Sequence, residues 1–211
     1  APVFTADPIA GSDADEDAAY AATIAGSATD DDSGATLTYA KVSGPAWLTV
    51  AIDGTLSGTP TNADVGLNAF TVSVTDGIIV TPVNATLNIT VTNTNDAPFF
   101  VADPIAGSAA IEDAIYASTI AGSATDIDPG AILTYAKVSG AAWLNVAANG
   151  TLSGTPTNAD VGVNAFTVSV TDGIIVTPVN ATLNITVTNT NDARVFTADP
   201  IAGSDADEDA A

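Results

Sequence analysis

The sequence predicts an all-β protein made of tandem β-sandwiches, and three observations support this fold class. The chain repeats itself with a period of 96 residues, apolar and polar residues alternate over several short segments, and clusters of Gly, Pro, Asp and Asn separate these segments. Such alternation is typical of strands with one buried and one solvated face, and the clusters indicate turns. We find no apolar stripe with helical spacing.

The repeat organises the chain into domains. The phrase A-D-P-I-A-G-S occurs with its proline at Pro8, Pro104 and Pro200, and residues 61–97 recur as 157–193 with a single change. A period of 96 residues exceeds that of solenoid repeats and suits an independently folding domain. We therefore place one module at 1–96, a second at 97–192, and the first-strand segment of a truncated third module at 193–211.

Within the first module, strands are predicted at residues 37–41, 47–50, 55–57, 70–75 and 83–91. In the last of these, the odd-numbered residues from Val83 to Val91 are apolar and the even-numbered ones are Asn or Thr. Several short strands in about 100 residues favour a Greek-key sandwich of the immunoglobulin type. Trp47 and Trp143 each lie in an apolar A-W-L triplet and are interpreted as core anchors, with sugar stacking as the alternative.

The charge composition limits the possible partners. The chain has 25 acidic side chains against three basic ones, Lys41, Lys137 and Arg194, and a formal net charge of −22. Internal ion pairs can satisfy few of these carboxylates, so the others must be solvated, protonated or bound to external cations. A nucleic-acid partner is not expected, because a phosphate-binding surface needs clustered Lys and Arg.

Missing residue types limit the chemistry. The chain contains no Cys, His or Met. Thiolate and imidazole metal sites are therefore excluded, and oxygen ligands are the only plausible metal chemistry. No apolar run approaches the roughly 20 residues that span a bilayer, so we expect no membrane-spanning segment. The N-terminus does not resemble a signal peptide, and we expect a fragment or a mature segment.

The junction between the modules carries a family resemblance. Residues 89–98 read I-T-V-T-N-T-N-D-A-P, and the next module contains T-D-I-D-P-G. This pattern resembles the linker of cadherin repeats and of the bacterial cadherin-like repeats, dystroglycan-type and immunoglobulin-like, of large surface or adhesin proteins. The resemblance implies Ca²⁺ ions between consecutive domains, held by acidic residues of one domain, by the linker and by a D-x-D pair of the next domain.

The resemblance assigns three groups of calcium ligands. The joint between the two modules would use Glu16, Asp64, Asn93, Asn95, Asp96, Asp126, Asp128 and Asp172. Half of a downstream joint would consist of Glu112, Asp160, Asn189, Asn191 and Asp192. Half of an upstream joint would consist of Asp30, Asp32 and Asp76.

The linker departs from the cadherin pattern. Asn93 stands where cadherins usually carry Asp, D-A-P replaces D-N-x-P, and the D-R-E motif is reduced to Asp64. Fewer charged ligands imply fewer ions per joint or weaker binding.

Elementary coordination chemistry supports the same reading. Calcium accepts six to eight oxygen ligands, and D-x-D on an extended segment places two carboxylates on one side. An EF-hand is excluded, because the twelfth position counted from Asp30 or Asp126 is Lys41 or Lys137 rather than Glu. The alternative is that the acids only solvate surface loops. Their clustering at strand ends and at the joint argues against it.

These observations predict a calcium-rigidified structural or adhesive repeat of an extracellular, bacterial surface protein rather than an enzyme. Its partners would be neighbouring copies of the same module, and a polysaccharide or another cell-surface ligand. Two alternatives stay open. The chain could be a filament subunit, whose segment 193–211 adds a strand to a neighbour, or a calcium-dependent carbohydrate-binding module.

Overall fold

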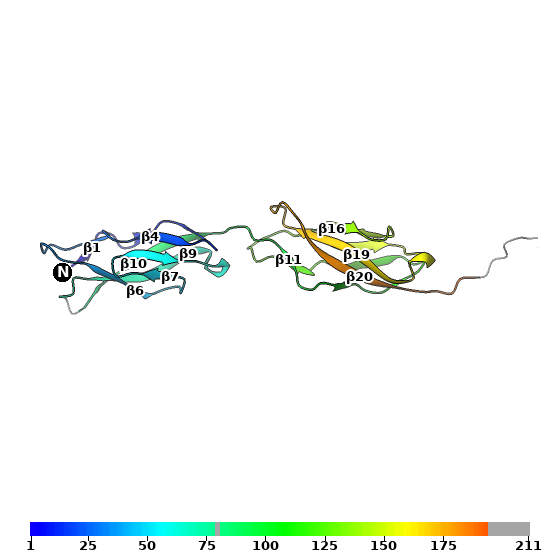
Figure 1. The fold of residues 1–211 in the computed structure, drawn as a ribbon, viewed down its shortest axis with the longest axis horizontal. Coiled ribbons are helices and arrows are strands. Elements are labelled where there is room, and N and C mark those ends of the chain that lie inside the picture. Colours follow the sequence, from blue (N-terminus) through cyan, green and yellow to red (C-terminus); the bar gives the residue numbers. More distant parts are fainter. Residues whose placement is uncertain (79–80, 194–211) are drawn as a thin grey trace, which may run out of the picture. The chain divides into compact units, whose positions relative to one another are not determined.

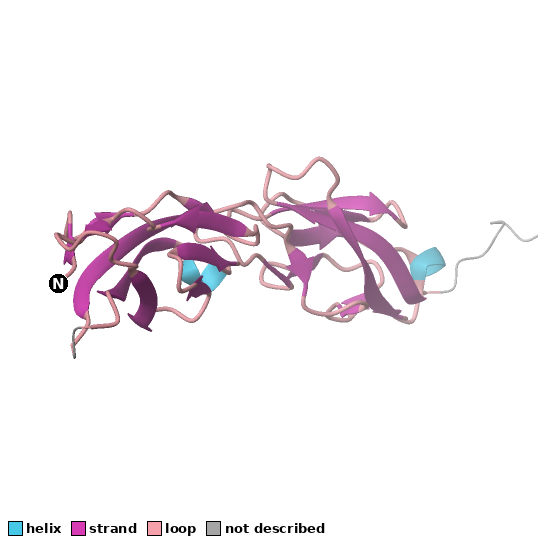
Figure 2. Ribbon diagram, turned by 60° about the vertical axis from the view of Figure 1, so that its left-hand side comes forward, coloured by secondary structure: helices cyan, strands magenta, loops and turns pink. Residues whose placement is uncertain are grey.

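The computed structural model describes residues 1–78 and 81–193 (Figure 1). The chain divides into two compact units, each built of strands joined by loops (Figure 2). The first unit comprises 1–98 together with 126–132 and 172–176, and the second comprises the remaining residues. The first unit therefore includes two segments of the second sequence repeat. The segment predicted at 193–211 lies outside the described residues, apart from Ala193.

The first repeat contains a five-stranded sheet in the order β2-β10-β9-β6, with β3 also paired to β10. The long strand β10 is antiparallel to β9, which is antiparallel to β6, whereas β2 and β3 run parallel to β10. These strands are β2 (Ile9–Ala10), β3 (Ala14–Asp15), β6 (Thr38–Ser43), β9 (Gly66–Thr75) and β10 (Val83–Thr92). This arrangement places the start of the chain along the edge of β10.

A three-stranded antiparallel sheet forms the second layer of the first repeat, which also contains a separate pair of short strands. The larger sheet has the order β4-β8-β7, and the short pair is β1-β5. Their bounds are β4 (Tyr20–Thr23), β7 (Leu48–Val50), β8 (Thr55–Gly58), β1 (Val3–Phe4) and β5 (Ala28–Thr29). A 3₁₀ turn, η1 (Asn62–Asp64), precedes β9.

The second repeat has the same strand topology. Its elements are β11 (Phe99–Phe100), β12 (Ile105–Ala106), β13 (Ala110–Ile111), β14 (Tyr116–Thr119), β15 (Ala124–Thr125), β16 (Thr134–Ser139), β17 (Leu144–Val146), β18 (Thr151–Gly154), η2 (Asn158–Asp160), β19 (Gly162–Thr171) and β20 (Val179–Thr188). The predicted all-β sandwich class is confirmed. In the described part of the chain, no helix has the length and apolarity needed to cross a bilayer.

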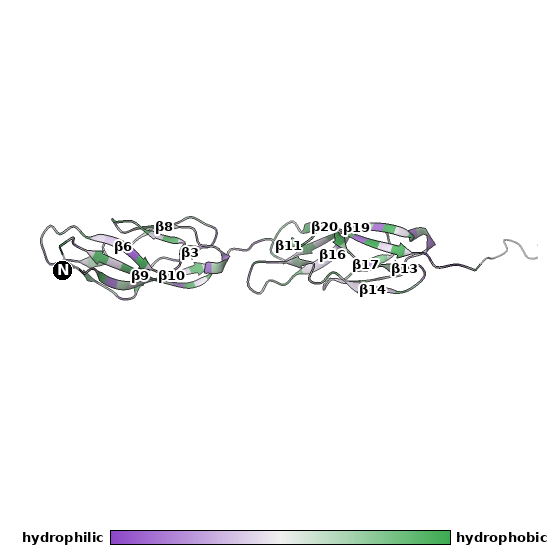
Figure 3. Ribbon diagram, turned by 90° about the horizontal axis from the view of Figure 1, so that it is seen from below, coloured by the Kyte–Doolittle hydropathy of each residue, from purple (hydrophilic) through white to green (hydrophobic). Residues whose placement is uncertain are grey.

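Apolar side chains of the two sheets form the core of each repeat. Along β10 the hydropathy alternates residue by residue (Figure 3), and its inward residues pair in register with those of β9, such as Leu87 with Phe70. Phe70 is 1% exposed and Leu87 is fully buried. Complete burial of such side chains contributes about 1.5–3 kcal/mol each, so the alternating strands supply most of the force that closes the sandwich.

Trp47 borders this core. Its indole ring makes edge-to-face contacts with Tyr20 at 5.6 Å and with Phe70 at 5.5 Å between ring centroids. Its Nε1–H donates to Oδ1 of the buried Asn68 at 3.0 Å. Trp143 makes the equivalent contacts in the second repeat. The interpretation of both tryptophans as core anchors is confirmed.

A turn before β8 contains a carboxylate, Asp53, that should make the stability of the protein depend on pH. Oδ1 of Asp53 accepts the backbone N–H of Thr55 at 2.9 Å, and the N–H and hydroxyl of Thr55 lower the pKa of Asp53. A carboxylate whose pKa is depressed by folding stabilises the protein above its ordinary pKa, and this contribution disappears as the pH falls through the depressed value. Asp53→Asn should therefore flatten the acid limb of the stability curve below about pH 4.

The second repeat supplies the control for this prediction. It carries Asn149 at the same turn, where Oδ1 accepts the N–H of Thr151 at 3.0 Å. Asn149→Asp should therefore add the pH dependence that Asp53→Asn removes. Chemical denaturation at a series of pH values measures both effects. Parallel curves for all three proteins would show that this turn does not contribute to the acid sensitivity.

Candidate metal site

Three carboxylates from distant parts of the sequence converge in the first unit. Glu16 follows β3, Asp96 follows β10, and Asp128 lies in the loop between β15 and β16. One carboxylate oxygen from each of the three lies within 4.8 Å of the others. Such a group of oxygens, on a protein of net charge −22, has the donor chemistry that a hard cation such as Ca²⁺ prefers.

Glu16 is the most constrained member of the cluster. Its side chain is 1% exposed, and Oε1 accepts the backbone N–H of Thr94 at 2.7 Å. Oε2 is buried and has no hydrogen-bond partner. Burial of a carboxylate oxygen without a partner is destabilising. A bound cation would remove this penalty, so the buried Oε2 indicates a ligand in a way that an exposed acidic cluster does not.

The backbone around Glu16 fixes the position of its side chain. The N–H of Glu16 donates to the carbonyl of Thr92 at 3.1 Å, which continues the parallel pairing of β3 with β10. Asp17 follows in a left-handed conformation with φ of 58°, and its N–H donates to the carbonyl of Pro60 at 2.9 Å. The sharp turn at Asp17 ends the edge strand and directs Glu16 inward.

The Asp126–Asp128 segment is held by backbone donors. The N–H of Asp128 donates to Oδ1 of Asp126 at 2.9 Å, and the N–H of Asp96 donates to Oδ2 of Asp128 at 2.7 Å. These bonds orient Asp128 toward Asp96 and Glu16. The two aspartates of the D-x-D pair therefore have different roles. Asp126 accepts a backbone hydrogen bond within the loop, and Asp128 contributes to the cluster.

Three asparagine side chains surround the cluster. Asn93 Nδ2 donates to Asp128 Oδ1 at 3.0 Å, and Asn95 Nδ2 donates to Asp172 Oδ2 at 2.8 Å. Asn62, which the sequence did not single out, places Nδ2 at 3.4 Å from Asp128 Oδ1 and at 3.5 Å from Asp96 Oδ2. Its signal in the sequence was its place in the same N-A-D turn as Asp64.

Asp172 is satisfied by donors from its own loop. The N–H groups of Ile174 and Ile175 donate to Oδ1 at 2.8 and 3.0 Å. The hydrogen bond from Ile175 is the main cause that lowers the pKa of Asp172, with contributions from Ile174 and Asn95. Asp172 is therefore ionised at neutral pH and lies beside the cluster without belonging to it.

The structure gives Asp64 a local role. Its Oδ2 accepts the backbone N–H and the hydroxyl of Thr61, each at 2.9 Å, and so caps η1. Asp160 caps η2 in the same way, through Thr157. Neither residue belongs to a described cluster of three carboxylates.

A cavity of about 320 Å³ adjoins the cluster within the first unit. Its lining includes Asn93, Asn95, Asp128, Ile132, Asp172 and Ile174. A volume of this size can hold several water molecules, each of which occupies about 30 Å³ in the liquid. Water can therefore complete the coordination of an ion that receives fewer than six protein oxygens.

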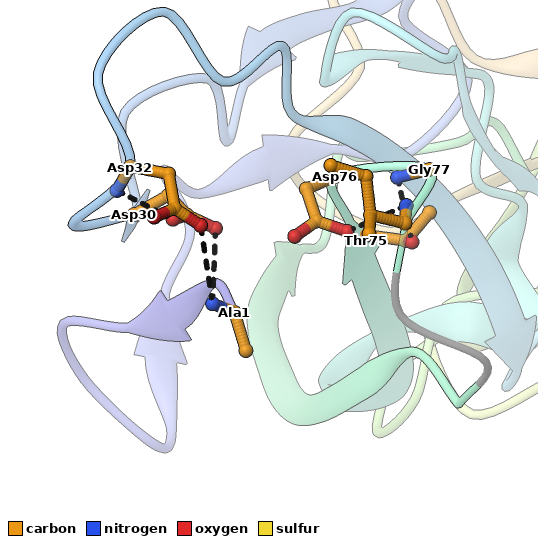
Figure 4. A network of polar contacts seen from close by, with 7 residues as sticks. Ala1, Asp30, Asp32, Thr75, Asp76 and Gly77 are labelled. Carbon is orange, nitrogen blue, oxygen red and sulfur yellow. Dashed lines mark hydrogen bonds and ion pairs between the residues drawn. The ribbon is translucent and has the colours of Figure 1, made fainter.

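The upstream ligands form a second cluster, Asp30, Asp32 and Asp76, whose oxygens also lie within 4.8 Å of one another. Figure 4 shows the α-amino group of Ala1 beside it, 3.6 Å from Asp30 Oδ2 and 4.0 Å from Asp32 Oδ2. The side chain of Asp30 is only 3% exposed. A positively charged group thus already lies against this set of aspartates.

The downstream ligands lie in the second unit. Glu112 is 2% exposed, its Oε1 accepts the N–H of Thr190, and its Oε2 is buried without a hydrogen-bond partner. Asn158 donates to Asp192 Oδ2 at 3.1 Å. The amides of Asn189 and Asn191 donate to the carbonyls of Thr190 and Asp192. Residues 193–211 do not extend to the position of the D-x-D pair that would complete this joint.

The ammonium groups of Lys41 and Lys137 donate hydrogen bonds to backbone carbonyls. Lys41 Nζ donates to the carbonyls of Pro45 at 2.5 Å and Leu48 at 2.9 Å. Lys137 repeats the arrangement with two carbonyls of the second repeat. Each ammonium group therefore ties its own strand to the following loop.

Comparisons with known proteins agree with this architecture. A protein-family model described as Putative Ig domain matches residues 1–95 and 97–190. Mouse protocadherin-24 EC1-3 is 16% identical over 89% of this chain and 70% of its own, with a TM-score of 0.64. Human protocadherin-24 EC1-2 is 20% identical over 90% of this chain and 98% of its own, with a TM-score of 0.59. At these identities the likeness shows the fold.

An enzyme also matches over part of its length. An endo-fucoidan hydrolase from glycoside hydrolase family 107 is 31% identical over 90% of this chain, with a TM-score of 0.44. The chain spans 29% of the length of that enzyme. No curated protein matches the sequence.

Proposed function

Since the chain belongs to the Putative Ig domain family, with two tandem repeats that fold as cadherin-like sandwiches, we propose that it is a calcium-rigidified structural or adhesive repeat of an extracellular surface protein. The observation that carries this proposal is Oε2 of Glu16, a buried carboxylate oxygen without a hydrogen-bond partner. The carboxylate of Glu16 lies in a cluster with those of Asp96 and Asp128.

The residues present fit a hard cation. Glu16, Asp96 and Asp128 would supply three charged oxygens, and water in the adjoining cavity would supply others. The chain has no sulfur or imidazole ligand, which favours Ca²⁺ over zinc or copper. The ion would also reduce the repulsion among three like charges that lie close together.

The proposed effect of the ion is mechanical. Glu16 and Asp96 belong to the first sequence repeat, whereas Asp128 belongs to the second. An ion that binds all three would fix residues 126–132 against the first repeat and would restrict the linker that follows Asp96. A string of such repeats would become stiff when calcium is present and flexible when it is removed.

The proposed role does not involve catalysis, and its partners would be neighbouring copies of the repeat. Two near-identical copies are what a spacer requires, whereas an enzyme needs one distinctive site. The tryptophans do not support the carbohydrate-binding alternative, because the ring and the N–H of Trp47 are both used in the core.

Calcium should raise the thermal unfolding midpoint of this chain above its value in EDTA, and magnesium should raise it much less. Extracellular modules bind calcium at about 10⁻⁴–10⁻³ M. At a calcium concentration of 100 times the dissociation constant, one site adds about 2.7 kcal/mol to the free energy of unfolding. Asp128→Ala should abolish this gain, because it removes the carboxylate that reaches Asp96 and Glu16.

Asp13→Ala is the matched control for this experiment. Asp13 is exposed, the substitution removes the same charge, and the second repeat carries Ala109 at the equivalent position. This variant should keep the full response to calcium. An unchanged midpoint of the unsubstituted chain in millimolar calcium would contradict the proposal.

A further inference from the structure

We propose that Asn62, Asn93 and Asn95 take the place of further cations at the candidate metal site, so that the site binds a single calcium ion. This inference rests on the proposed function and concerns the number of ions and the residues that set it. It follows from the way in which hydrogen-bond donors are distributed over the carboxylates around the site.

Asp172 has a donor on each of its oxygens. Two backbone N–H groups donate to Oδ1, and the amide of Asn95 donates to Oδ2 at 2.8 Å. An N–H group placed against a carboxylate oxygen stabilises its charge by hydrogen bonding, as an ion would by coordination. Asp172 is therefore compensated without an ion and, at neutral pH, needs neither a proton nor a metal.

Asp128 receives donors on both of its oxygens as well. Asn93 and Asn62 place amide nitrogens at 3.0 and 3.4 Å from Oδ1, and the N–H of Asp96 lies 2.7 Å from Oδ2. A carboxylate offers about four lone-pair positions, so three donors leave Asp128 with capacity for one cation.

Glu16 is the opposite case. Its Oε2 is buried and has no hydrogen-bond donor, while one carboxylate oxygen from each of Asp96 and Asp128 lies within 4.8 Å of a Glu16 oxygen. Among Glu16, Asp128 and Asp172, only Glu16 therefore has an oxygen without a donor. An ion at Glu16 is needed to satisfy Oε2, whereas an ion beside Asp172 would have to displace the amide of Asn95.

The number of ions depends on whether positions 93 and 95 carry an amide or a carboxylate. An asparagine can offer its oxygen to an ion only if the amide turns over, and it then loses the N–H donation that it makes here. An aspartate at position 93 or 95 would instead place a second negative charge beside Asp128 or Asp172. Like charges at this distance repel and create the need for another cation. Asn93 and Asn95 thus limit the site to one ion.

The test counts calcium ions by isothermal titration calorimetry and by equilibrium dialysis. The number bound at this site is the total for the chain minus the total for its Asp128→Ala variant, which leaves the other acidic clusters unchanged. We expect a difference of one ion. The total for the Asn93→Asp, Asn95→Asp variant should exceed the total for the unsubstituted chain by one ion, because the new carboxylates leave negative charge to be compensated beside Asp128 and Asp172.

Asn84→Asp with Asn88→Asp is the matched control. It adds the same two charges to β10, outside the cluster. It should bind the same total number of calcium ions as the unsubstituted chain. Because Asn93 and Asn95 are exposed, both double variants should fold, and circular dichroism checks this. If the Asn93→Asp, Asn95→Asp variant does not fold, Asn95→Asp alone gives the same test.

The possible outcomes separate the two proposals. If the unsubstituted chain and its Asp128→Ala variant bind the same number of calcium ions, the calcium function itself is refuted. A difference of one, with no additional ion bound by the chain after both asparagines become aspartates, would leave that function intact and overturn the role of the amides. A difference of two or more in the unsubstituted chain would overturn the single-ion inference.

Discussion

Replacing Gly58 with alanine is expected to disrupt the sandwich of the first repeat, at a cost of about 3 kcal/mol or more in the free energy of unfolding. Gly58 lies at the end of β8, where it pairs with Leu48 of β7. A Cβ atom at this position would overlap the carbonyl oxygen of Trp47 and lie 2.9 Å from its carbonyl carbon. Because both are backbone atoms, no change of rotamer can relieve the overlap. Relief requires β7 to move away from β8.

Gly26→Ala is the control for this substitution. Gly26 also has a positive φ, 88°, but a Cβ atom there would have no neighbour within 4 Å. The free energy of unfolding of this variant should fall by only about 1–2 kcal/mol, which is the cost of placing a residue with a side chain in a left-handed backbone conformation. Chemical denaturation of both variants measures the difference. Equal losses would show that the backbone overlap at Gly58 is relieved locally and that β7 does not move.

Glu16→Gln should change stability in opposite directions with and without calcium. In EDTA the variant should be more stable than the unsubstituted chain by about 1–3 kcal/mol, because a buried charge with an unpartnered oxygen is removed. The new amide N–H can donate to Asp96 or Asp128, and Oε1 still accepts the N–H of Thr94. In saturating calcium the variant should be the less stable of the two proteins, because one charged ligand is lost.

Glu112→Gln tests whether this reversal is specific to the cluster. Glu112 has the same burial, the same backbone donor contact and an unpartnered Oε2, but it belongs to no described cluster of three carboxylates. Its substitution should stabilise the chain in EDTA and leave the calcium-dependent gain unchanged. Differential scanning calorimetry measures both variants. If Glu16→Gln were destabilising in EDTA as well, a bound ion would not be the reason for the buried carboxylate.

The strands from β6 to β10 could be predicted from sequence, and those from β1 to β5 could not. The predicted segments 70–75 and 83–91 lie within β9 and β10, whose alternation is regular. The two-residue strands β1, β2, β3 and β5 were missed. A strand of two residues has no periodicity to detect. Its position is fixed by the partner, as when Ile9 aligns with Leu87 of β10.

Only part of the candidate site could be predicted from the sequence. The acid residues could be identified because they cluster at strand ends, and Glu16, Asp96 and Asp128 were among them. The role of Asp64 could not be read in the same way, because a carboxylate that caps a turn and one that binds a metal have the same residue type. Asn62 was missed because its amide reaches Asp96 and Asp128 only in the folded chain.

From the sequence one can predict that this protein is a tandem repeat of β-sandwiches, that its surface is strongly acidic, and that oxygen is its only metal-ligand chemistry. These properties follow from periodicity and composition, which are local or additive. The tertiary structure alone decided which carboxylates meet, that Glu16 retains a buried oxygen without a donor, and that asparagine amides compensate Asp128 and Asp172. Such properties depend on groups that are distant in sequence, and only folding brings these groups within hydrogen-bond distance.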